Sequence, residues 1–172
     1  MNQFSYYNPT RIEFGKSKEN QIGKLIAEQG VDKVLLLYGT GSIKKSGLYD
    51  RVVKSLNEAG VAFEELGGIV SNPKLSHVKQ GIEIAKSKGV KAILGVGGGS
   101  VADSAKAIAV GALYDGDVWD FFVCKASIKV ALPVYTVMTL AATASEMNGN
   151  SVVTNDDTKQ KYSIASVQIG RA

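Results

Sequence analysis

The stretch LGVGGGSVADSAKA, residues 94–107, places four glycines within five positions at the end of an apolar run. Inside a regular element, each glycine costs roughly 0.5–1 kcal/mol relative to alanine. The apolar run predicts a buried strand over 90–96, and the alanine-rich segment predicts a helix over 101–113. The glycines between them indicate a place where bare backbone is required.

The same alternation of strand and helix extends in both directions along the chain. Apolar runs predict further strands over 34–38, 61–66 and 133–137. Val34–Tyr38 is apolar throughout, which is typical of a strand covered on both faces of a parallel sheet. The sequence therefore predicts an α/β fold over residues 1–172, with a Rossmann-like, mostly parallel sheet and flanking helices.

Shorter features fall at the two ends. Residues 4–14 alternate aromatic and polar side chains, which predicts a short hairpin, and Ser17 is expected to cap the following helix. A second hairpin is expected from 150–154 and 161–165. His77, the one histidine, is expected on the surface of a helix.

Composition narrows the class of protein. Apolar residues make up 45% of the chain and charged residues 21%, as in globular proteins. The net charge of +4 is spread along the chain, so we interpret it as solvated surface rather than a nucleic-acid site. Cys124 is the one cysteine, which fits a reducing compartment. No secretory signal or apolar run of membrane-spanning length is found, so we expect a cytoplasmic protein with no membrane partner.

The glycine stretch has a chemical interpretation. In an open parallel sheet, ligands bind beyond the carboxyl ends of the strands, where a helix N-terminus favours an anion. Gly97-x-Gly99-x-x-Ala102 fits the relaxed dinucleotide pattern, whereas no Gly-Lys-Ser/Thr follows as in a Walker loop. Phosphate binding is the favoured reading, and a tight structural turn is the alternative.

Two further loops are candidates for the same edge. The neutral residues 39–42, followed by Lys44 and Lys45, leave room and donors for a ribose 2′-phosphate; an ordinary polar loop is the alternative. Thr139 and Thr143 would share one face if a helix starts there. They would then cap that helix or touch a ligand, and capping is favoured.

Three stretches together resemble the iron-containing alcohol dehydrogenases. They are YNPTRIEFG (7–15), GGGSVADSAK (97–106) and TLAATASEMN (139–148). The loop YGTGSIKK (38–45) is similar to that of the NADP-dependent, butanol-dehydrogenase-like branch. The resemblance implies a dehydroquinate-synthase-like N-terminal domain that binds NADP(H), and a hydride transfer between this cofactor and a small alcohol or aldehyde.

The resemblance also implies roles for particular residues. Gly97, Gly98, Gly99 and Ser100 would cradle the pyrophosphate. The adenosine end and its 2′-phosphate would be bound by Gly39, Gly41, Ser42 and Lys45. The rest of the cleft would be lined by Thr139, Thr143, Asn150 and Lys161. Asp103 and Lys106 would lie near the nicotinamide or support the loop.

Some positions depart from the family pattern TTAGTGSE. Leu140 removes a hydroxyl, and Ala144 replaces a glycine. In the family, a helical C-terminal domain supplies one Asp and three His to iron or zinc, and here the sequence ends with VQIGRA. We therefore expect no metal site in this chain, negligible activity alone, and a homo-oligomer formed through residues 4–14.

Two other readings stay open. The chain could be a nucleotide-binding module without chemistry, or a fragment of a relative of glycerol dehydrogenase or dehydroquinate synthase. Those relatives use NAD, so the loop over 38–45 argues against the second reading.

Overall fold

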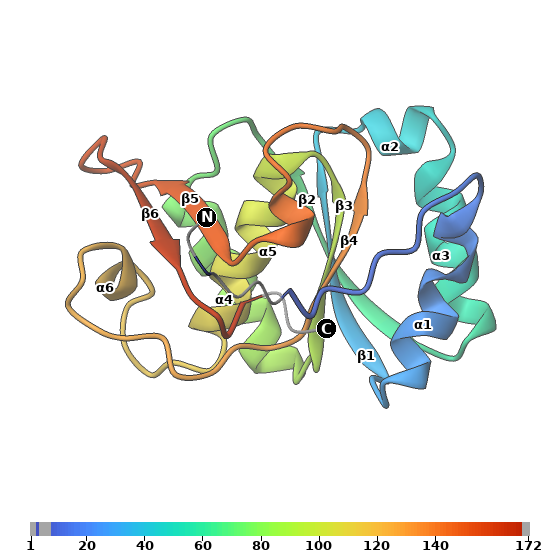
Figure 1. Cartoon of the computed structure of the whole chain (residues 1–172), viewed down its shortest axis with the longest axis horizontal. Coiled ribbons are helices and arrows are strands. Elements are labelled where there is room, and N and C mark those ends of the chain that lie inside the picture. Colours follow the sequence, from blue (N-terminus) through green and yellow to red (C-terminus); the bar gives the residue numbers. More distant parts are fainter. Residues whose placement is uncertain (1–2, 4–7, 170–172) are drawn as a thin grey trace.

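The computed structural model describes residue 3 and residues 8–169 of the chain. In this part of the chain, a sheet of four parallel strands has the order β2-β1-β3-β4 (Figure 1). The strands are β1 (Lys33–Gly39), β2 (Ala62–Ile69), β3 (Ala92–Gly97) and β4 (Val134–Met138). The predicted α/β class and parallel sheet are confirmed.

Helices cover both faces of this sheet. On one side lie α1 (Ile22–Glu28) and α3 (Leu48–Glu58), and on the other α4 (Leu75–Lys88) and α5 (Gly99–Gly111) (Figure 1). The shorter helical pieces are η1 (Lys18–Gln21), α2 (Ser42–Lys45), α6 (Trp119–Phe122) and η2 (Ser145–Met147). No helix among the described residues has the length and apolar character needed to cross a membrane.

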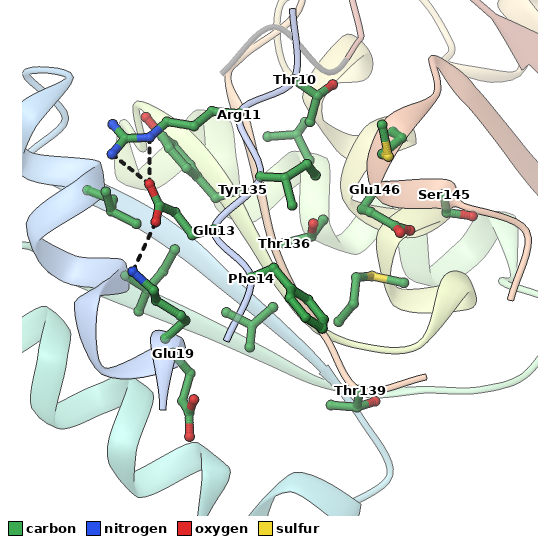
Figure 2. A pocket seen from close by; sticks show the side chains of 18 of the residues that line it. Thr10, Arg11, Glu13, Phe14, Glu19, Tyr135, Thr136, Thr139, Ser145 and Glu146 are labelled. Atoms are coloured by element: carbon green, nitrogen blue, oxygen red, sulfur yellow. Dashed lines mark hydrogen bonds and ion pairs between the residues drawn. The ribbon is translucent and has the colours of Figure 1, made fainter. Parts of the chain in front are cut away.

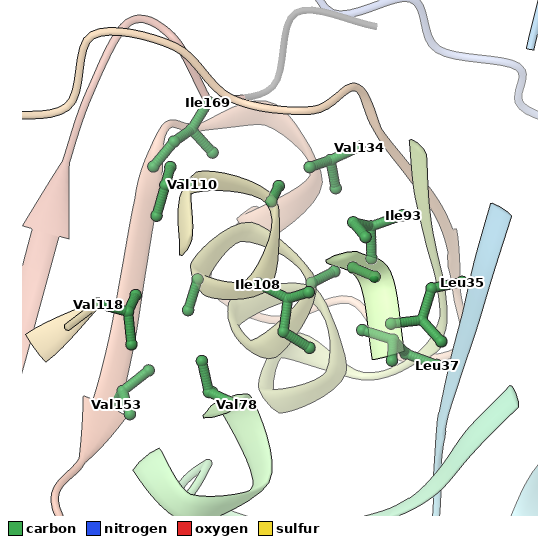
Figure 3. Close-up of a cluster of buried hydrophobic side chains, with 14 of the residues drawn as sticks. Leu35, Leu37, Val78, Ile93, Ile108, Val110, Val118, Val134, Val153 and Ile169 are labelled. Atoms are coloured by element: carbon green, nitrogen blue, oxygen red, sulfur yellow. The ribbon is translucent and has the colours of Figure 1, made fainter. Parts of the chain in front are cut away.

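The apolar strand β1 is buried on both faces, as its sequence predicts. Val34 and Leu36 belong to the hydrophobic cluster that includes residues of α1 and α3. Leu35 and Leu37 point the other way, into the cluster built by α4 and α5 (Figure 3). Alternate residues of one strand therefore serve two cores, because successive side chains in a strand point to opposite faces.

The strand order fixes where a ligand can enter. The chain runs from β1 outward to β2, and then crosses back to β3 on the other side of β1. This reversal makes the gap between the carboxyl ends of β1 and β3 a topological switch point, which is where open α/β sheets bind ligands. Two of the predicted ligand loops, 39–45 and 97–100, follow these two strands.

The C-terminal hairpin is also confirmed. Strands β5 (Asn150–Thr154) and β6 (Lys161–Ala165) pair antiparallel and form a separate small sheet. The Ser151 hydroxyl donates a hydrogen bond of 2.7 Å to the Asp103 carbonyl, which ties β5 to α5. The hairpin therefore packs beside the helix that begins at the glycine stretch.

Two local expectations fail, and a helix that was left open after Thr139 is not formed. Residues 8–14 contain no strand, and the rest of the predicted 4–14 hairpin lies outside the described residues. Ser17 precedes η1 with a φ of 62° and makes no capping side-chain hydrogen bond. The segment 139–144 forms bends rather than a helix, because it turns across the end of the sheet towards η2.

Candidate dinucleotide-binding site

The helix α5 begins directly at the end of the central strand. The Gly98 carbonyl accepts hydrogen bonds from the amides of Val101 at 3.0 Å and Ala102 at 3.2 Å. The amides of Gly99 and Ser100 come before these two and have no carbonyl one turn earlier to accept them. No acidic side chain lies in this first turn. The positive end of α5 is therefore suited to an anion.

Gly98 distinguishes ligand binding from a structural turn. Its φ of −89° and ψ of −171° are allowed to any residue. A Cβ built at Gly98 meets no described atom within 4 Å. The backbone therefore does not need glycine at this position, and the open space above it is available to a ligand.

The neighbouring glycines have other roles. A Cβ at Gly97 would lie 2.7 Å from Cγ2 of Val101, so Gly97 allows α5 to pack closely on β3. A Cβ at Gly99 would lie 3.5 Å from the Ser145 hydroxyl, which is an ordinary contact. The structural-turn alternative thus accounts for Gly97 but not for Gly98.

The loop after β1 lies on the other side of the switch point. Gly41 precedes the short α2 and has a φ of 130°, which residues other than glycine rarely adopt. Its carbonyl accepts hydrogen bonds from the amides of Lys44 and Lys45. Ser42 is exposed, and no acidic residue lies between Gly39 and Lys45.

The structure separates the two lysines of this loop. The Lys44 ammonium lies 4.8 Å from the ring centroid of Tyr38 and 4.6 Å from that of Tyr49. Both phenols donate hydrogen bonds to Glu65, and this bond raises the pKa of Tyr49 to about 12. Lys45 is exposed and forms no ion pair or side-chain hydrogen bond with the described residues. Lys44 is thus held by the aromatic pair, whereas Lys45 is available to a ligand.

The segment 139–148 covers the start of α5. The Thr139 amide donates a 3.0 Å hydrogen bond to the Gly97 carbonyl, so Thr139 sits at the site's edge. The hydroxyls of Thr143 and Ser145 lie 3.1 Å apart. Ala144 has a φ of 52°, which explains why the family pattern places glycine there. Thr139 and Thr143 therefore lie on an irregular loop beside the start of α5, not on one helix face.

The other predicted residues lie beyond the first turn of α5, as Asp103 does, or on the β5–β6 hairpin, as Asn150 and Lys161 do. Burial raises the pKa of Asp103, against the opposing effects of Lys106, the Val152 amide and Lys161. The Lys161 ammonium donates a 2.6 Å hydrogen bond to the Asn72 side chain. Asn150 offers its main-chain carbonyl to Lys106 at 2.8 Å. Asn150 and Lys161 therefore flank the site on the β5–β6 hairpin and do not line the glycine loop.

A groove of about 610 Å³ meets the site at Thr139 and Ser145 (Figure 2). It runs along β4, between this strand and the segment 10–15, and Gly98 and Gly99 do not line it. Exposed apolar side chains on its walls are Ile12, Phe14, Leu140 and Met147. Sequence reasoning missed this groove; the alternation in residues 4–14 was the available signal.

No metal centre is formed by the described residues. Among them, no group of three or more His, Cys, Asp or Glu side chains is close enough to hold an ion. His77 is half-buried rather than at the surface, and its covered Nε2 has no hydrogen-bond partner among the described residues. The donor set on the described part of the chain therefore does not fit iron or zinc, which need about three protein ligands.

The sheet order and the glycine loop at the switch point define a doubly wound α/β domain of the class that binds nucleotides. The model of the iron-containing alcohol dehydrogenases matches residues 9–169. The chain belongs to this family.

Individual relatives agree with this assignment. The chain is 51% identical to a probable NADH-dependent butanol dehydrogenase 1 of Bacillus subtilis, over 94% of its own length and 42% of the relative. It is 35% identical to the NADPH-dependent aldehyde reductase YqhD of Escherichia coli, over 98% of this chain and 43% of that one. A solved structure of NADH-dependent butanol dehydrogenase A from Thermotoga maritima matches with a TM-score of 0.96 and 52% identity, over 98% and 42% of the two chains. The chain thus spans less than half the length of these relatives.

Proposed function

We propose that residues 1–172 form the dinucleotide-binding domain of an NADP-dependent alcohol dehydrogenase or aldehyde reductase. The observation that carries the proposal is the open space above Gly98. It lies at the start of α5, where the amides of Gly99 and Ser100 have no carbonyl one turn earlier to accept them. Family membership and the switch-point position support it. The described residues offer no comparable explanation of Gly98 from the packing of the chain itself.

The residues divide the cofactor between them. The amides of Gly99 and Ser100 would bind the diphosphate, with Thr139 and Thr143 on the side of the loop that covers α5. Gly39, Gly41, Ser42 and Lys45 would bind the adenosine end. When bound, the nicotinamide supplies or accepts the hydride exchanged with a small alcohol or aldehyde.

Two features favour NADP over NAD. A carboxylate at the end of β1 or β2 would repel a 2′-phosphate, but these strands end in neutral residues at Gly39 and Ile69. Glu65 lies within β2, and its oxygens accept hydrogen bonds from Tyr38 and Tyr49. The names of the relatives point in both directions, to NADH and to NADPH. We therefore base this choice on the free Lys45.

We propose that the catalytic metal is held by the part of the relatives' length that residues 1–172 do not span. A divalent ion in such an enzyme polarises the carbonyl as a Lewis acid. The described residues supply no ligand set for it, so we assign no catalytic step to them.

This proposal predicts how the chain behaves in an assay. The isolated chain should oxidise NADPH negligibly with butanal, even when loaded with iron or zinc. Mixing it with the C-terminal part of a full-length relative should restore NADPH oxidation, measured by absorbance. Activity of the chain alone would contradict the assignment of the metal to the part of the relatives that these residues do not span. Cofactor binding without any restored activity would favour a non-catalytic nucleotide-binding module.

We also propose that the chain is a homo-oligomer. Phe14 is 94% exposed and Ile12 is 48% exposed on the wall of the groove, beside Leu140. Such clustered apolar surface is uncommon on soluble monomers. Light scattering should give at least twice the mass of 18.2 kDa, and Phe14→Ser should weaken the association. A monomer across the micromolar range would refute the prediction.

A further inference from the structure

Lys106 is a charged side chain inside the protein. It is only 2% exposed, and it extends from the middle of α5. Among the described residues, no carboxylate lies within ion-pair distance of its ammonium. A buried charge without such a partner costs several kcal/mol, and an apolar side chain of similar size is often as stable or more so. Stability alone therefore does not account for a lysine here.

The contacts of Lys106 lead to the loop that covers the start of α5. Its Nζ donates hydrogen bonds to the Asn148 side-chain oxygen at 3.2 Å and to the Asn150 carbonyl at 2.8 Å. The side-chain nitrogen Nδ2 of Asn148 in turn donates hydrogen bonds to the main-chain carbonyls of Thr143 at 3.2 Å and Ala144 at 2.9 Å. Asn148 thus links Lys106 to the left-handed turn at Ala144.

This turn carries a pair of hydroxyls to the glycine stretch. The Thr143 and Ser145 hydroxyls lie 3.1 Å apart. The Ser145 oxygen lies 3.5 Å from the place that a Cβ on Gly99 would occupy, and Ser145 is buried. A series of hydrogen bonds therefore runs from Lys106 through Asn148 to the loop whose Thr143 and Ser145 hydroxyls lie beside Gly99.

We infer that Lys106 is a positioning residue of the dinucleotide site, acting through Asn148 on the loop that carries Thr143 and Ser145. The inference rests on the proposed function. It separates the two roles left open for Lys106 in the sequence, because the ammonium is used to hold the loop.

The positive charge of Lys106 strengthens its hydrogen bonds to Asn148 and Asn150. Burial lowers the pKa of Lys106 to about 8, against the opposing effects of Asp103 on α5 and Glu146 on η2. Lys161 on β6 also acts on Asp103. A protonated amine donates stronger hydrogen bonds to the two oxygens than a neutral one. The hydrogen bonds of Lys106 to Asn148 and Asn150 should therefore weaken as the pH rises through about 8.

The test compares NADPH titrations of wild type, Lys106→Met, Asn148→Ala and the double variant, followed by fluorescence. Methionine keeps the unbranched stem and removes the donors. We expect Lys106→Met to bind NADPH about tenfold more weakly without a lower melting temperature. Lys79→Met, at an exposed lysine of α4, is the matched control and should bind as wild type does. The double variant should bind no more weakly than the weaker single one, because both changes break the same series of contacts.

A pH series gives a readout that a purely structural role would not change. Wild-type affinity should fall between pH 7 and 9, and Lys106→Met should lose this dependence. Unchanged affinity in Lys106→Met, or losses that add in the double variant, would overturn the inference. If Lys106→Met does not fold, Asn148→Ala alone must lose both affinity and pH dependence for the inference to stand. Absence of NADPH binding by wild type would instead refute the proposed function.

Discussion

Gly98→Val should abolish dinucleotide binding and leave a folded domain. Valine adopts the extended backbone of Gly98 without strain, and a Cβ there meets no described atom within 4 Å. Its methyl groups would instead occupy the space in which the diphosphate approaches Gly99 and Ser100. Losing two hydrogen bonds to a charged group at ~1.5–3 kcal/mol each predicts at least about hundredfold weaker binding. Calorimetric titration measures the affinity, and circular dichroism measures the fold.

Two other variants serve as controls for this result. Gly98→Ala places a single methyl in the same space and should weaken binding less than valine does. Gly97→Ala should lower the melting temperature, because its Cβ would lie 2.7 Å from the Val101 side chain. If Gly98→Val keeps wild-type affinity, the glycine stretch serves the turn alone and the site lies elsewhere.

Lys45→Ala should change the choice of cofactor. The exposed Lys45 ammonium is free of partners among the described residues, so it can pair with a 2′-phosphate. Removing one charge-assisted contact should cost ~1.5–3 kcal/mol of NADPH binding, or at least about tenfold in affinity. NADH lacks this phosphate and should bind the variant as it binds wild type. Parallel titrations with the two cofactors measure both quantities.

Lys44→Ala is the matched control, since it removes the same charge one residue away. Lys44 lies against Tyr38 and Tyr49, so its loss should affect the stability of the loop more than the preference between cofactors. Wild-type binding of NADH more tightly than NADPH would refute the NADP proposal and would agree with the names of the Bacillus and Thermotoga relatives.

The strands of the sheet could be predicted from the sequence because their apolar residues form clear patterns. The continuous apolar run over β1 predicts burial on both faces, and each residue from Val34 to Leu37 is buried in one core or the other. The hairpin over β5 and β6 was equally clear from the turn residues between them. Local pattern was sufficient for these elements because burial and turn chemistry act over short stretches.

The candidate site could be predicted only in part from the sequence. Sequence reasoning found the loops that follow β1 and β3, but the strand order that brings them together depends on long-range packing. It treated the glycines as equal, although Gly97 packs against Val101 and Gly98 faces open space. It left open whether a helix starts after Thr139, where the left-handed Ala144 and the hydrogen bonds of the Asn148 side chain hold a turn instead. Contacts between distant segments decided each of these points.

The central claim is that this chain binds a nicotinamide dinucleotide at the carboxyl ends of β1 and β3. The most direct measurement is calorimetric titration of NADPH into the wild-type chain, with Gly98→Val titrated in parallel. We expect saturable binding at one site per chain, lost in the variant. No heat of binding from folded wild-type protein, or equal binding by Gly98→Val, would contradict it.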